Sequence, residues 1–457
     1  MKLDLADVNP NKWQMFYKGK EVPIYVAGKD DNVFNTSDFI EFYAELNDGE
    51  LDKELYKNPN HLANDRYSMI TDTSCYYLTF LPASSSITPR HMKNYSNTAY
   101  SSYTEVPYFL HESFTQFNTN YCHGKGFDVS GSEASNPEYT EAEGFASIPF
   151  GFGTSYSTWL APVQSRFYNP AGPAPVFSFS SIGASIKYDT SFVKKDHRFV
   201  LKTSTDNFGY SQLLDTTFYG YKIIKRSFTL NSAQIGANET YFRFEPQFIS
   251  GVGYQAHAVN YVSLTYPRNF DLNGRSSFKF KIQGDNNPKL VVWYNYANTK
   301  AEPIYYDLTN DYRVRGQKFD LTTVRAIMPP STQNTEYFIH DSLETNFLVA
   351  NDIQAAISPE SLDDQSFMTF DPTKEINKNR LVLLTNGRFI GQYVSDYLLL
   401  RQSTTQTSPN TVVNINQLYE HFSYGVPHPM AIRRYIRYLK ENGDTTLKFI
   451  FIVGRGY

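Results

Sequence analysis

Cysteine, charge and long apolar runs are all scarce in this sequence. Only two cysteines, Cys75 and Cys122, occur among 457 residues, so no disulfide framework organises the chain. Charged residues make up 19% of the chain and the formal net charge is −4, with no basic stripe that would attract nucleic acid. No run reaches the length of about 18 apolar residues that a membrane-spanning helix needs. Alanine, glutamate, lysine and leucine do not dominate, which excludes a coiled coil.

Aromatic residues are abundant instead. The chain has 36 tyrosines and 35 phenylalanines, and its hydrophobic fraction of 41% is enough to bury large apolar areas. A disordered chain is therefore excluded. Tyrosine, phenylalanine and threonine are typical of strands, and polar residues are typical of the loops between them. At about 150 residues per domain, the length suggests about three domains.

Residues 1–360 carry the pattern of short strands joined by turns. Turn sequences such as Asn47–Gly49 and Gly284–Pro288 separate apolar or alternating runs that recur about every 10–20 residues. This spacing, with no helical periodicity between the runs, predicts β-sandwiches. Between Ser84 and Pro175 we expect long loops on a β scaffold. The predicted strands are Val22–Val26, Phe39–Tyr43, Tyr76–Phe80, Val176–Phe179, Arg198–Lys202, Phe218–Ile224, Tyr241–Phe244, Tyr261–Tyr266, Ser277–Ile282 and Lys289–Tyr294.

Near residue 372 the pattern changes to alternating strands and helices. Compact apolar runs predict strands, and apolar residues at helical spacing predict the helices between them. The order strand, helix, strand, helix, strand is the opening of an open parallel α/β sheet. The predicted strands are Arg380–Thr385, Thr411–Ile415 and Lys448–Val453, and the predicted helices are Gln392–Gln402 and the segment from Pro429 to Leu439.

The last predicted helix has the clearest boundaries. Pro429 suits its first turn, and Gly443 suits the residue just beyond its end. The strand that follows, Lys448–Val453, is apolar on both faces, as a strand covered by helices on both sides would be. Because the sequence stops four residues later, we expect this strand to expose an unpaired apolar edge and the α/β domain to be truncated.

These patterns predict a mainly β protein, with β-sandwich-like N-terminal domains followed by a truncated open parallel α/β domain. We expect an N-terminal β domain at 1–100, a β-sandwich domain with long loops at 101–285, a small β domain or linker region at 286–372, and the first part of the α/β domain at 373–457. The first residues, Met1–Asp7, are acidic and lack the apolar middle of a signal peptide. The protein is therefore cytosolic, or an export signal is missing from this version of the chain.

The ends of the predicted parallel strands are the first place to look for a site, because ligands of open α/β sheets bind beyond the carboxyl ends of the strands. These ends are Thr385–Gly387 and Gly454–Gly456. The second begins like a dinucleotide fingerprint but lacks the third glycine and a following helix. A tight turn is the favoured interpretation, and we predict no nucleotide cofactor.

Nucleophiles and bases are sparse. His421 and His428 could each serve as a catalytic base, although the position of His428 between two prolines at a helix start favours a capping or turn role. Ser423 does not stand in a G-x-S-x-G elbow. Cys122 and His123 are adjacent, which is the wrong spacing for a metal site, since neighbouring side chains of a strand point to opposite faces. We assign no catalytic, cofactor-binding or metal-binding residue.

Two loop clusters carry oxygen ligands that a structural Ca²⁺ would accept, Asp30–Asn32 and Asp285–Asn287. Neither follows the EF-hand pattern, and turn formation is the favoured interpretation. We expect no other metal or cofactor. Exposed aromatic residues in the loops of 95–160 could stack on sugars, although packing is the commoner role of single aromatic residues.

One run is specific enough to indicate a family. Leu418–Arg433, with the sequence LYEHFSYGVPHPMAIR, resembles the corresponding segment of gingipain-type cysteine peptidases, particularly the sortase of the type IX secretion system and its Bacteroidetes relatives. The flanking sequences RLVLLTN and LKFIFIVGRGY agree with the same domain. Asp38–Tyr43, Tyr67–Thr73 and His257–Arg268 resemble the β region that precedes the peptidase in those proteins. The resemblance is strongest over 380–457 and 22–80.

This resemblance implies a caspase-like α/β peptidase whose catalytic His and Cys both follow the GRGY-like turn. The chain is then an N-terminal fragment that ends before the dyad. The intact protein would attack peptide bonds with a thiolate and form an acyl-enzyme, and a sortase would transfer that acyl group to an amine. The resemblance also implies exported proteins or peptides as substrates, secretion-system components as partners, and the extracellular or outer-membrane surface as the location.

A second hypothesis is a non-catalytic surface β-sandwich protein that binds a glycan or a protein partner, because the aromatic β region forms most of the chain. The gene beyond the codon for Tyr457 separates the two. An in-frame continuation with a His and a Cys would favour the peptidase, and a stop codon would favour the binding protein.

Overall fold

The computed structural model describes residues 8–35, 38–129, 132–134, 136, 138–187, 194–297, 302–341, 371–376, 381–405 and 410–454. Contacts within the chain divide it into two compact units. Unit 1 comprises Met1–Glu54, Ile70–Arg90 and Ile353–Tyr457, and unit 2 comprises Leu55–Met69 and His91–Asp352. Both units unite segments that are far apart in the sequence, whereas the four domain ranges expected from the sequence stay a prediction.

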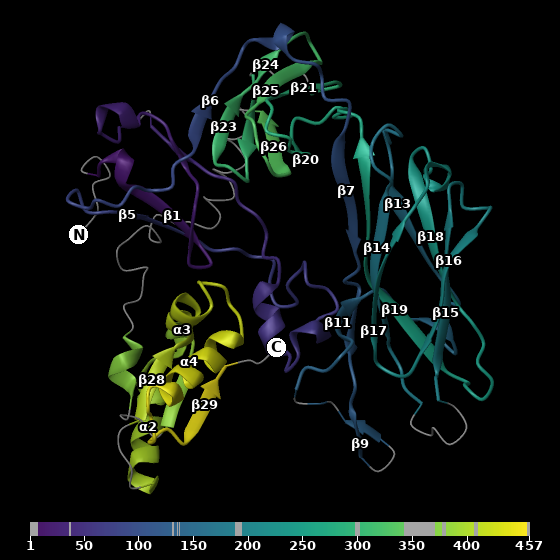
Figure 1. Ribbon diagram of the computed structural model, residues 1–457. Coiled ribbons are helices and arrows are strands. Elements are labelled where there is room, and N and C mark those ends of the chain that lie inside the picture. Colours follow the sequence, from purple (N-terminus) through teal and green to yellow (C-terminus); the bar gives the residue numbers. More distant parts are fainter. Residues whose placement is uncertain are drawn as a thin grey trace. The chain divides into compact units, whose positions relative to one another are not determined.

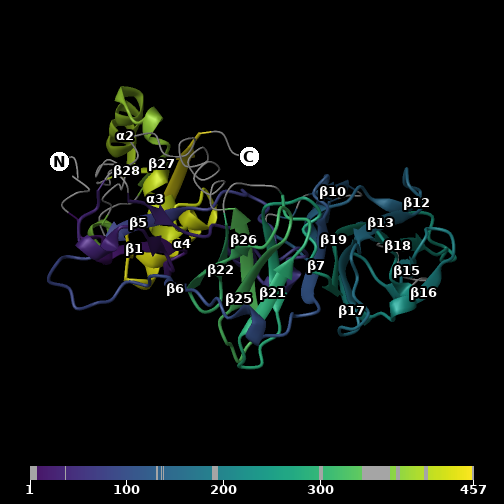
Figure 2. The ribbon, with the colours of Figure 1, turned by 90° about the horizontal axis from the view of Figure 1, so that it is seen from above.

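Most of unit 2 is antiparallel β structure arranged as two sandwiches (Figure 1). The first packs a four-stranded sheet against one half of a ten-stranded sheet, and Figure 2 shows this region from above. The four-stranded sheet has the order β13 (Trp159–Gln164), β18 (Glu239–Pro246), β15 (His197–Ser204) and β16 (Ser211–Phe218). The facing strands are, in order, β17 (Ile223–Thr229), β14 (Val176–Gly183), β19 (Gln255–Arg268) and β7 (Phe109–Gln116).

Alternation along these strands places their aromatic residues between the two sheets. Side chains of β18 alternate between half-buried and buried over its whole length, as expected of a strand with one face in a core. Phe177 of β14 and Phe242 of β18 stack with their ring centroids 3.5 Å apart, and Phe179 packs edge-on against Phe244. Aromatic pairs of this kind contribute about 0.5–1.5 kcal/mol beyond the area they bury.

The second sandwich uses the other half of the ten-stranded sheet. Trp293 is fully buried in its core, against Phe109, Phe270 and Phe280. The strands of this half are β20 (Phe278–Ile282), β26 (Thr335–Asp341), β22 (Pro303–Asp307), β23 (Tyr312–Arg315) and β6 (Lys93–Tyr95). They pack on a sheet of β21 (Lys289–Trp293), β25 (Val324–Met328) and β24 (Gln317–Lys318).

Shorter elements complete unit 2. β12 (Phe150–Phe152) pairs with β19, β8 (Asn120–His123) pairs with β11 (Glu143–Ala146), and β9 (Phe127–Val129) pairs with β10 (Ser132–Ala134). The 3₁₀ helices of this unit are η5 (Pro59–His61), η6 (Tyr100–Ser102) and η7 (Ser232–Gln234).

The N-terminal part of unit 1 is a small β structure. Its core contains Trp13, Met15, Ile24 and Val26. An antiparallel sheet has the order β2 (Lys20–Val22), β1 (Trp13–Tyr17) and β5 (Tyr76–Phe80), and β3 (Tyr25–Val26) pairs with β4 (Ile40–Glu41). The 3₁₀ helices are η2 (Pro10–Lys12), η3 (Lys29–Asp31) and η4 (Glu50–Leu55). The last residue of η4, Leu55, is the first residue of unit 2.

The C-terminal part of unit 1 is an open parallel α/β domain, which confirms the predicted fold class. β27 (Leu381–Thr385) lies between β28 (Asn410–Asn414) and β29 (Phe449–Val453), and both pairings are parallel. The helices are α2 (Gln392–Thr405), α3 (Ile415–Phe422) and α4 (Met430–Glu441), with the 3₁₀ helices η9 (Pro372–Glu375) and η10 (Gly387–Phe389). Helix α4 begins and ends as its sequence predicted, with Pro429 before its first residue and Gly443 at a φ of +88° beyond its end.

Several predicted elements differ from the structure. The predicted strand Phe218–Ile224 is wrong, because the chain turns at Gly220, with a φ of +64°, between β16 and β17. The expectation of long loops from Ser84 to Pro175 is wrong where β7 and β13 form long strands of the first sandwich. Helix α3 was missed because Ile415 was assigned to the preceding strand. Its apolar residues nevertheless have helical spacing: Ile415, Leu418, Tyr419 and Phe422.

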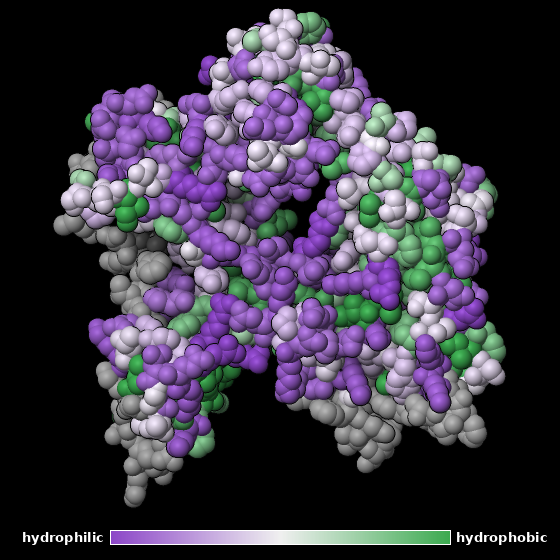
Figure 3. Space-filling view, in the orientation of Figure 1, coloured by the Kyte–Doolittle hydropathy of each residue, from purple (hydrophilic) through white to green (hydrophobic). Residues whose placement is uncertain are grey.

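The strand β29 is as exposed as its sequence predicted. It pairs with β27 along one edge, and no strand among the described residues pairs with its other edge. Its apolar side chains face solvent, with exposed fractions of 37–61%: Phe449, Ile450, Phe451 and Ile452. Figure 3 shows hydrophobic atoms at the surface of the α/β domain on the side of this strand.

Candidate functional site

The carboxyl ends of the parallel strands meet at one edge of the α/β sheet, as expected. Thr385 at the end of β27 is in register with Asn414 on one side and Val453 on the other. Its hydroxyl donates a hydrogen bond of 2.8 Å to the carbonyl oxygen of Val453. The first predicted strand end, Thr385–Gly387, therefore lies beside Val453, the residue before the second one, Gly454–Gly456, of which residues 455 and 456 lie outside the described residues.

Amide side chains at this edge hold the turns that leave the strands. The Asn386 side chain accepts a hydrogen bond from the backbone N–H of Arg388, at 3.1 Å. Asn414 Oδ1 accepts from the N–H groups of Gly387 and Asn416, at 3.1 and 3.2 Å. A Cβ atom at Gly387 would lie 2.6 Å from Asn414 Nδ2, so a larger residue here would displace the Asn414 side chain. Amides and a hydroxyl can position a ligand here, but they do not exchange protons at neutral pH.

His428 caps helix α4 and does not face this edge as a base. Its Nδ1 accepts a hydrogen bond of 3.1 Å from the N–H of Met430, so the ring proton is on Nε2. That nitrogen donates to Asp52 Oδ1 of η4 at 2.8 Å, and both side chains are fully buried. The interpretation of His428 as a capping residue is confirmed. Asp52 was not singled out in the sequence, because 376 residues separate it from His428.

A second contact joins η4 to α4. Arg434 forms an ion pair with Glu54, with its Nε 3.2 Å from Glu54 Oε2, and Arg433 donates to the Glu54 carbonyl oxygen at 2.9 Å. The hydrogen bond between the two side chains lowers the pKa of Glu54 and raises the pKa of Arg434. Within unit 1, the N-terminal segment is therefore fixed to the first turns of the helix by one buried pair and one half-buried pair.

His421 and Ser423 also have local structural roles. Nδ1 of His421 donates to the carbonyl oxygen of Gln417, one turn earlier in α3, at 2.9 Å. The hydroxyl of Ser423 lies 2.6 Å from the carbonyl oxygen of Val426 and 3.1 Å from that of Tyr419. It closes the turn that follows α3, which agrees with the absence of a nucleophile elbow in the sequence.

Neither cysteine has the properties of an activated nucleophile. Both are free thiols, Cys75 half-buried in unit 1 and Cys122 buried in unit 2. Burial raises the pKa of Cys75, and it raises the pKa of Cys122 to about 11. A catalytic thiol needs the opposite shift, because the thiolate is the nucleophile.

A serine, a histidine and an aspartate meet inside unit 2, an arrangement that the sequence did not reveal. Nδ1 of His197 is 2.8 Å from Asp196 Oδ1, and Nε2 is 3.1 Å from Ser185 Oγ and 3.0 Å from the carbonyl oxygen of Ala256. Ser185 Oγ also accepts from the N–H of Ala256, at 3.0 Å. His197 is fully buried and Ser185 only 7% exposed, so no substrate reaches them. The three side chains tie β15 to β19 and are not a triad.

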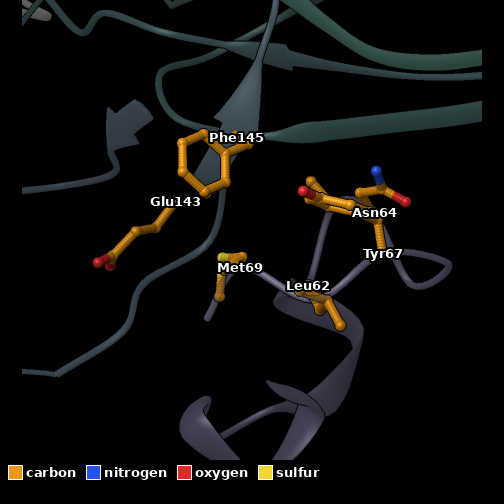
Figure 4. Close-up of a pocket in the computed structure, with 8 residues that line it drawn as sticks. Leu62, Asn64, Tyr67, Met69, Glu143 and Phe145 are labelled. Atoms are coloured by element: carbon orange, nitrogen blue, oxygen red, sulfur yellow. The ribbon is translucent and has the colours of Figure 1, made fainter. Parts of the chain in front are cut away.

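A small cavity lies between the segment before Met69 and strand β11 (Figure 4). Its volume is about 10 Å³, which is room for about one water molecule and not for a ligand. Leu62 and Met69 line it from one side and Phe145 from β11. The Glu143 carboxylate points away from the other labelled residues in Figure 4. Tyr56 donates to the carbonyl oxygen of Glu143 at 2.7 Å, so these contacts fix β11 within unit 2.

The carboxylates proposed for Ca²⁺ are engaged in turns. Asp31 accepts a hydrogen bond from the N–H of Val33, and Asp285 accepts from the N–H of Asn287 and pairs with Lys289. Across the described part of the chain, no group of three or more His, Cys, Asp or Glu side chains is placed to hold a metal ion. Structural Ca²⁺ stays a prediction. Also within that part, no helix is long and apolar enough to cross a membrane.

The described residues form a β-sandwich region and an open parallel α/β domain, and comparison with known sequences finds a family likeness in the α/β domain. Residues 375–457 match the sequence model described as Peptidase family C25, and over this segment the chain is similar to that gingipain-type family. No curated protein matches the chain.

Comparison with solved structures extends the likeness to the whole fold. The crystal structure of dimeric latent PorU from Porphyromonas gingivalis aligns with 97% of this chain at a TM-score of 0.50 and 12% sequence identity. The chain spans 39% of the length of that protein. The mannohexaose-bound CBM27-1 of Caldicellulosiruptor saccharolyticus aligns with 33% of this chain and 88% of its own at 16% identity, and its TM-score of 0.19 is too low to indicate a shared fold.

Proposed function

We propose that this chain is the β region and the opening strands and helices of the α/β domain of a gingipain-type cysteine endopeptidase, most similar to the sortase of the type IX secretion system. The observation that carries the proposal is the match of residues 375–457 to peptidase family C25, on a segment that folds as an open parallel sheet. The proposed substrates are exported proteins, the partners are components of the secretion system, and the location is the cell surface.

The catalytic thiol and imidazole of that enzyme lie, on this proposal, outside the described residues. Three properties support this. Burial raises the pKa of both cysteines. His428 is fully buried as a helix cap with Asp52, and His421 donates a hydrogen bond to the backbone of its own helix. None of these groups is available to form a thiolate–imidazole pair.

The chemistry proposed for the intact enzyme is covalent. A thiolate attacks the carbonyl carbon of the peptide bond, the leaving amine takes a proton from the histidine, and an acyl-enzyme forms. Water completes hydrolysis, whereas an amine acceptor completes transpeptidation. The Thr385–Asn414 edge of the sheet is the face on which the reacting groups would gather, since sites of open α/β sheets lie beyond the carboxyl ends of the strands.

The test is an activity assay of the purified 457-residue chain on fluorogenic Arg and Lys peptides and on a sorting-signal peptide. We expect no turnover above the rate of a C75S C122S control. Turnover that disappears in this control would show that Cys75 or Cys122 is the nucleophile and would overturn the placement of the catalytic thiol. Equal turnover in both proteins that a protease inhibitor abolishes would identify a contaminating peptidase. The assay would then be repeated on a second, independently purified preparation.

A further inference from the structure

A cavity of about 330 Å³ opens within unit 2, where β7, the end of β19 and the start of β20 come together. This volume is in the range of sites that bind small ligands or single side chains. Its lining combines guanidinium groups with aromatic rings. Sequence patterns do not indicate this cavity, because the contributing residues come from several separate segments between residues 111 and 278.

Arg268 is the buried charge in this wall. It is only 6% exposed, and its one hydrogen bond is a donation of 2.7 Å to the carbonyl oxygen of Asp271. Its Nε has no hydrogen-bond partner, and no carboxylate of the described residues forms an ion pair with it. The guanidinium lies over the rings of Phe167 and Phe278, at 5.1 and 4.5 Å from their centroids. A buried guanidinium without an anion is costly, so this group favours an anionic ligand.

Most of the other charged groups around the cavity are cationic, although the Asp271 carboxylate is near enough to act on the charge of Arg268. Arg166 and Arg275 line the same cavity and are exposed. The one acidic residue of the lining, Glu112, is bound by Arg66, with Nη2 and Oε2 2.8 Å apart. Burial lowers the pKa of His111 to about 3, with a smaller contribution from the charges of Arg268 and Arg275, so this ring adds no charge at neutral pH. The cavity therefore has an excess of positive charge.

The cavity also runs along an open strand edge. Four consecutive residues of β7, His111–Phe114, line it. Successive side chains of a strand point to opposite faces, so four in a row can line one cavity only where it follows the edge. β7 pairs with β19 along its whole length, but β20 pairs with its other edge at the single position Lys281–Leu110. Beyond Leu110, no strand of the described residues pairs with that edge.

We propose that this cavity binds an extended acidic peptide, which adds to the open edge of β7 and places a carboxylate on Arg268 and Arg275. Two parallel N–H···O bonds from a guanidinium fork match the carboxylate, and backbone hydrogen bonds to β7 supply the rest of the affinity. Phe114, Phe167 and Phe278 accept the apolar side chains that flank the acid. An acidic sugar would satisfy the arginines but would not use the strand edge, and for this reason the geometry favours a peptide. This site does not depend on the peptidase proposal.

Binding can be measured with the whole 457-residue chain by fluorescence anisotropy. The probe is a dye-labelled heptapeptide of alternating Val and Thr with one central Glu, at about 50 mM salt, where charge contacts are weakly screened. Its matched controls are the same peptide with Gln in place of Glu, and the same peptide N-methylated at alternate backbone positions. We expect the Glu peptide to bind at least about tenfold tighter than either control.

Protein variants test the arginines. Arg275→Gln changes an exposed side chain and should weaken binding by about fivefold or more, as should Arg268→Lys, which keeps the charge but loses the fork. Arg226→Gln, at an exposed position of β17 outside the cavity, is the matched control and should change binding by less than about twofold. Thermal unfolding of each variant verifies that it is folded.

Three results would overturn the proposal. Equal affinity for the Glu and Gln peptides would show that the carboxylate does not contribute to binding. Undiminished binding of the N-methylated peptide would show that the edge of β7 does not contribute. The third result is a chain that binds oligoglucuronate but none of the peptides, which would assign the cavity to acidic glycans.

Discussion

His428 and Asp52 are a buried pair in unit 1, with neither side chain exposed to solvent. The histidine satisfies two groups at once, since Nδ1 accepts from the backbone of α4 and Nε2 donates to the carboxylate. Removing one member of such a pair leaves the other buried without its partner, and this penalty exceeds the net gain of forming the pair.

We expect His428→Ala to lower the free energy of unfolding of the chain by about 2–4 kcal/mol, because the Asp52 carboxylate and the N–H of Met430 both lose a partner. Asp52→Asn is the control, since the amide oxygen still accepts from Nε2 and the loss should be smaller. Urea unfolding measures the change, and hydrogen exchange at residues 430–441 locates it. Equal, small losses for both variants would contradict a structural role for the pair.

The burial of the two thiols predicts how fast each one reacts with an alkylating reagent and how that rate depends on pH. The pKa of Cys122 is raised from 9.0 to about 11 by burial, so its thiolate fraction at neutral pH is about a hundredfold below that of a free thiol. Both cysteines should react with iodoacetamide more slowly in the native chain than in urea, Cys122 most slowly, and their rates should rise as the pH rises from 7 towards 10. Mass spectrometry of the alkylated peptides gives the two rates separately. Fast labelling of either native thiol at pH 7 would indicate an activated nucleophile.

At the scale of elements, two glycines border helix α4 with similar backbone conformations and different surroundings. Gly425, in the turn before the helix, has a φ of +81°, and Gly443, after its end, has a φ of +88°. A Cβ atom at Gly425 would lie 2.3 Å from the hydroxyl oxygen of Tyr77 and 3.0 Å from Cys75 Cβ. A Cβ atom at Gly443 meets nothing within 4 Å. The first turn is therefore packed closely against β5 and the residue before it.

Gly443→Ala should lower the stability by about 1 kcal/mol, the cost of a left-handed backbone alone. Gly425→Ala should cost about 1–3 kcal/mol more, because β5 or the turn must also move. Thermal and urea unfolding of the two variants, made in parallel, give the difference. If both substitutions cost the same, the close packing of the turn against Tyr77 is not significant for stability.

At the scale of the whole molecule, β29 is an apolar strand with an exposed face and an exposed edge. Its outer edge has no partner strand in the described part of the chain, and Ile452 is 61% exposed. Natural sheets avoid such edges, because unpaired backbone groups beside apolar side chains recruit another strand.

We therefore expect the chain to self-associate as its concentration rises, and Ile452→Lys to shift it towards the monomer, since a charged edge opposes strand pairing. Leu46→Lys, which replaces an apolar residue that is 72% exposed in a loop of the same unit, is the matched control and should not change the association. Sedimentation velocity over a concentration series measures both. A wild-type chain that stays monomeric, or an equal effect of the two lysines, would contradict association through β29.

The sequence pattern predicted many of the strands and helices, because each of these elements depends on residues that are neighbours in the sequence. The aromatic and apolar run Tyr76–Phe80 determines one strand, and the 3.6-residue spacing, proline and glycine of α4 determine one helix. Both elements were predicted close to their observed bounds. The exposed character of β29 also followed from its sequence. Where a run contained a turn residue, as at Gly220, the same reasoning joined two strands into one.

The sequence by itself determined the mainly β class, the open parallel α/β segment and the likeness to gingipain-type peptidases. Tertiary structure alone decided that Asp52 meets His428, that Glu54 meets Arg434, and that Arg268 lies beside the open edge of β7. The physical reason is that these contacts join groups separated by up to 380 residues or gather residues from several segments. Periodicity and capping carry no information about such partners, which depend on the register and packing of whole sheets.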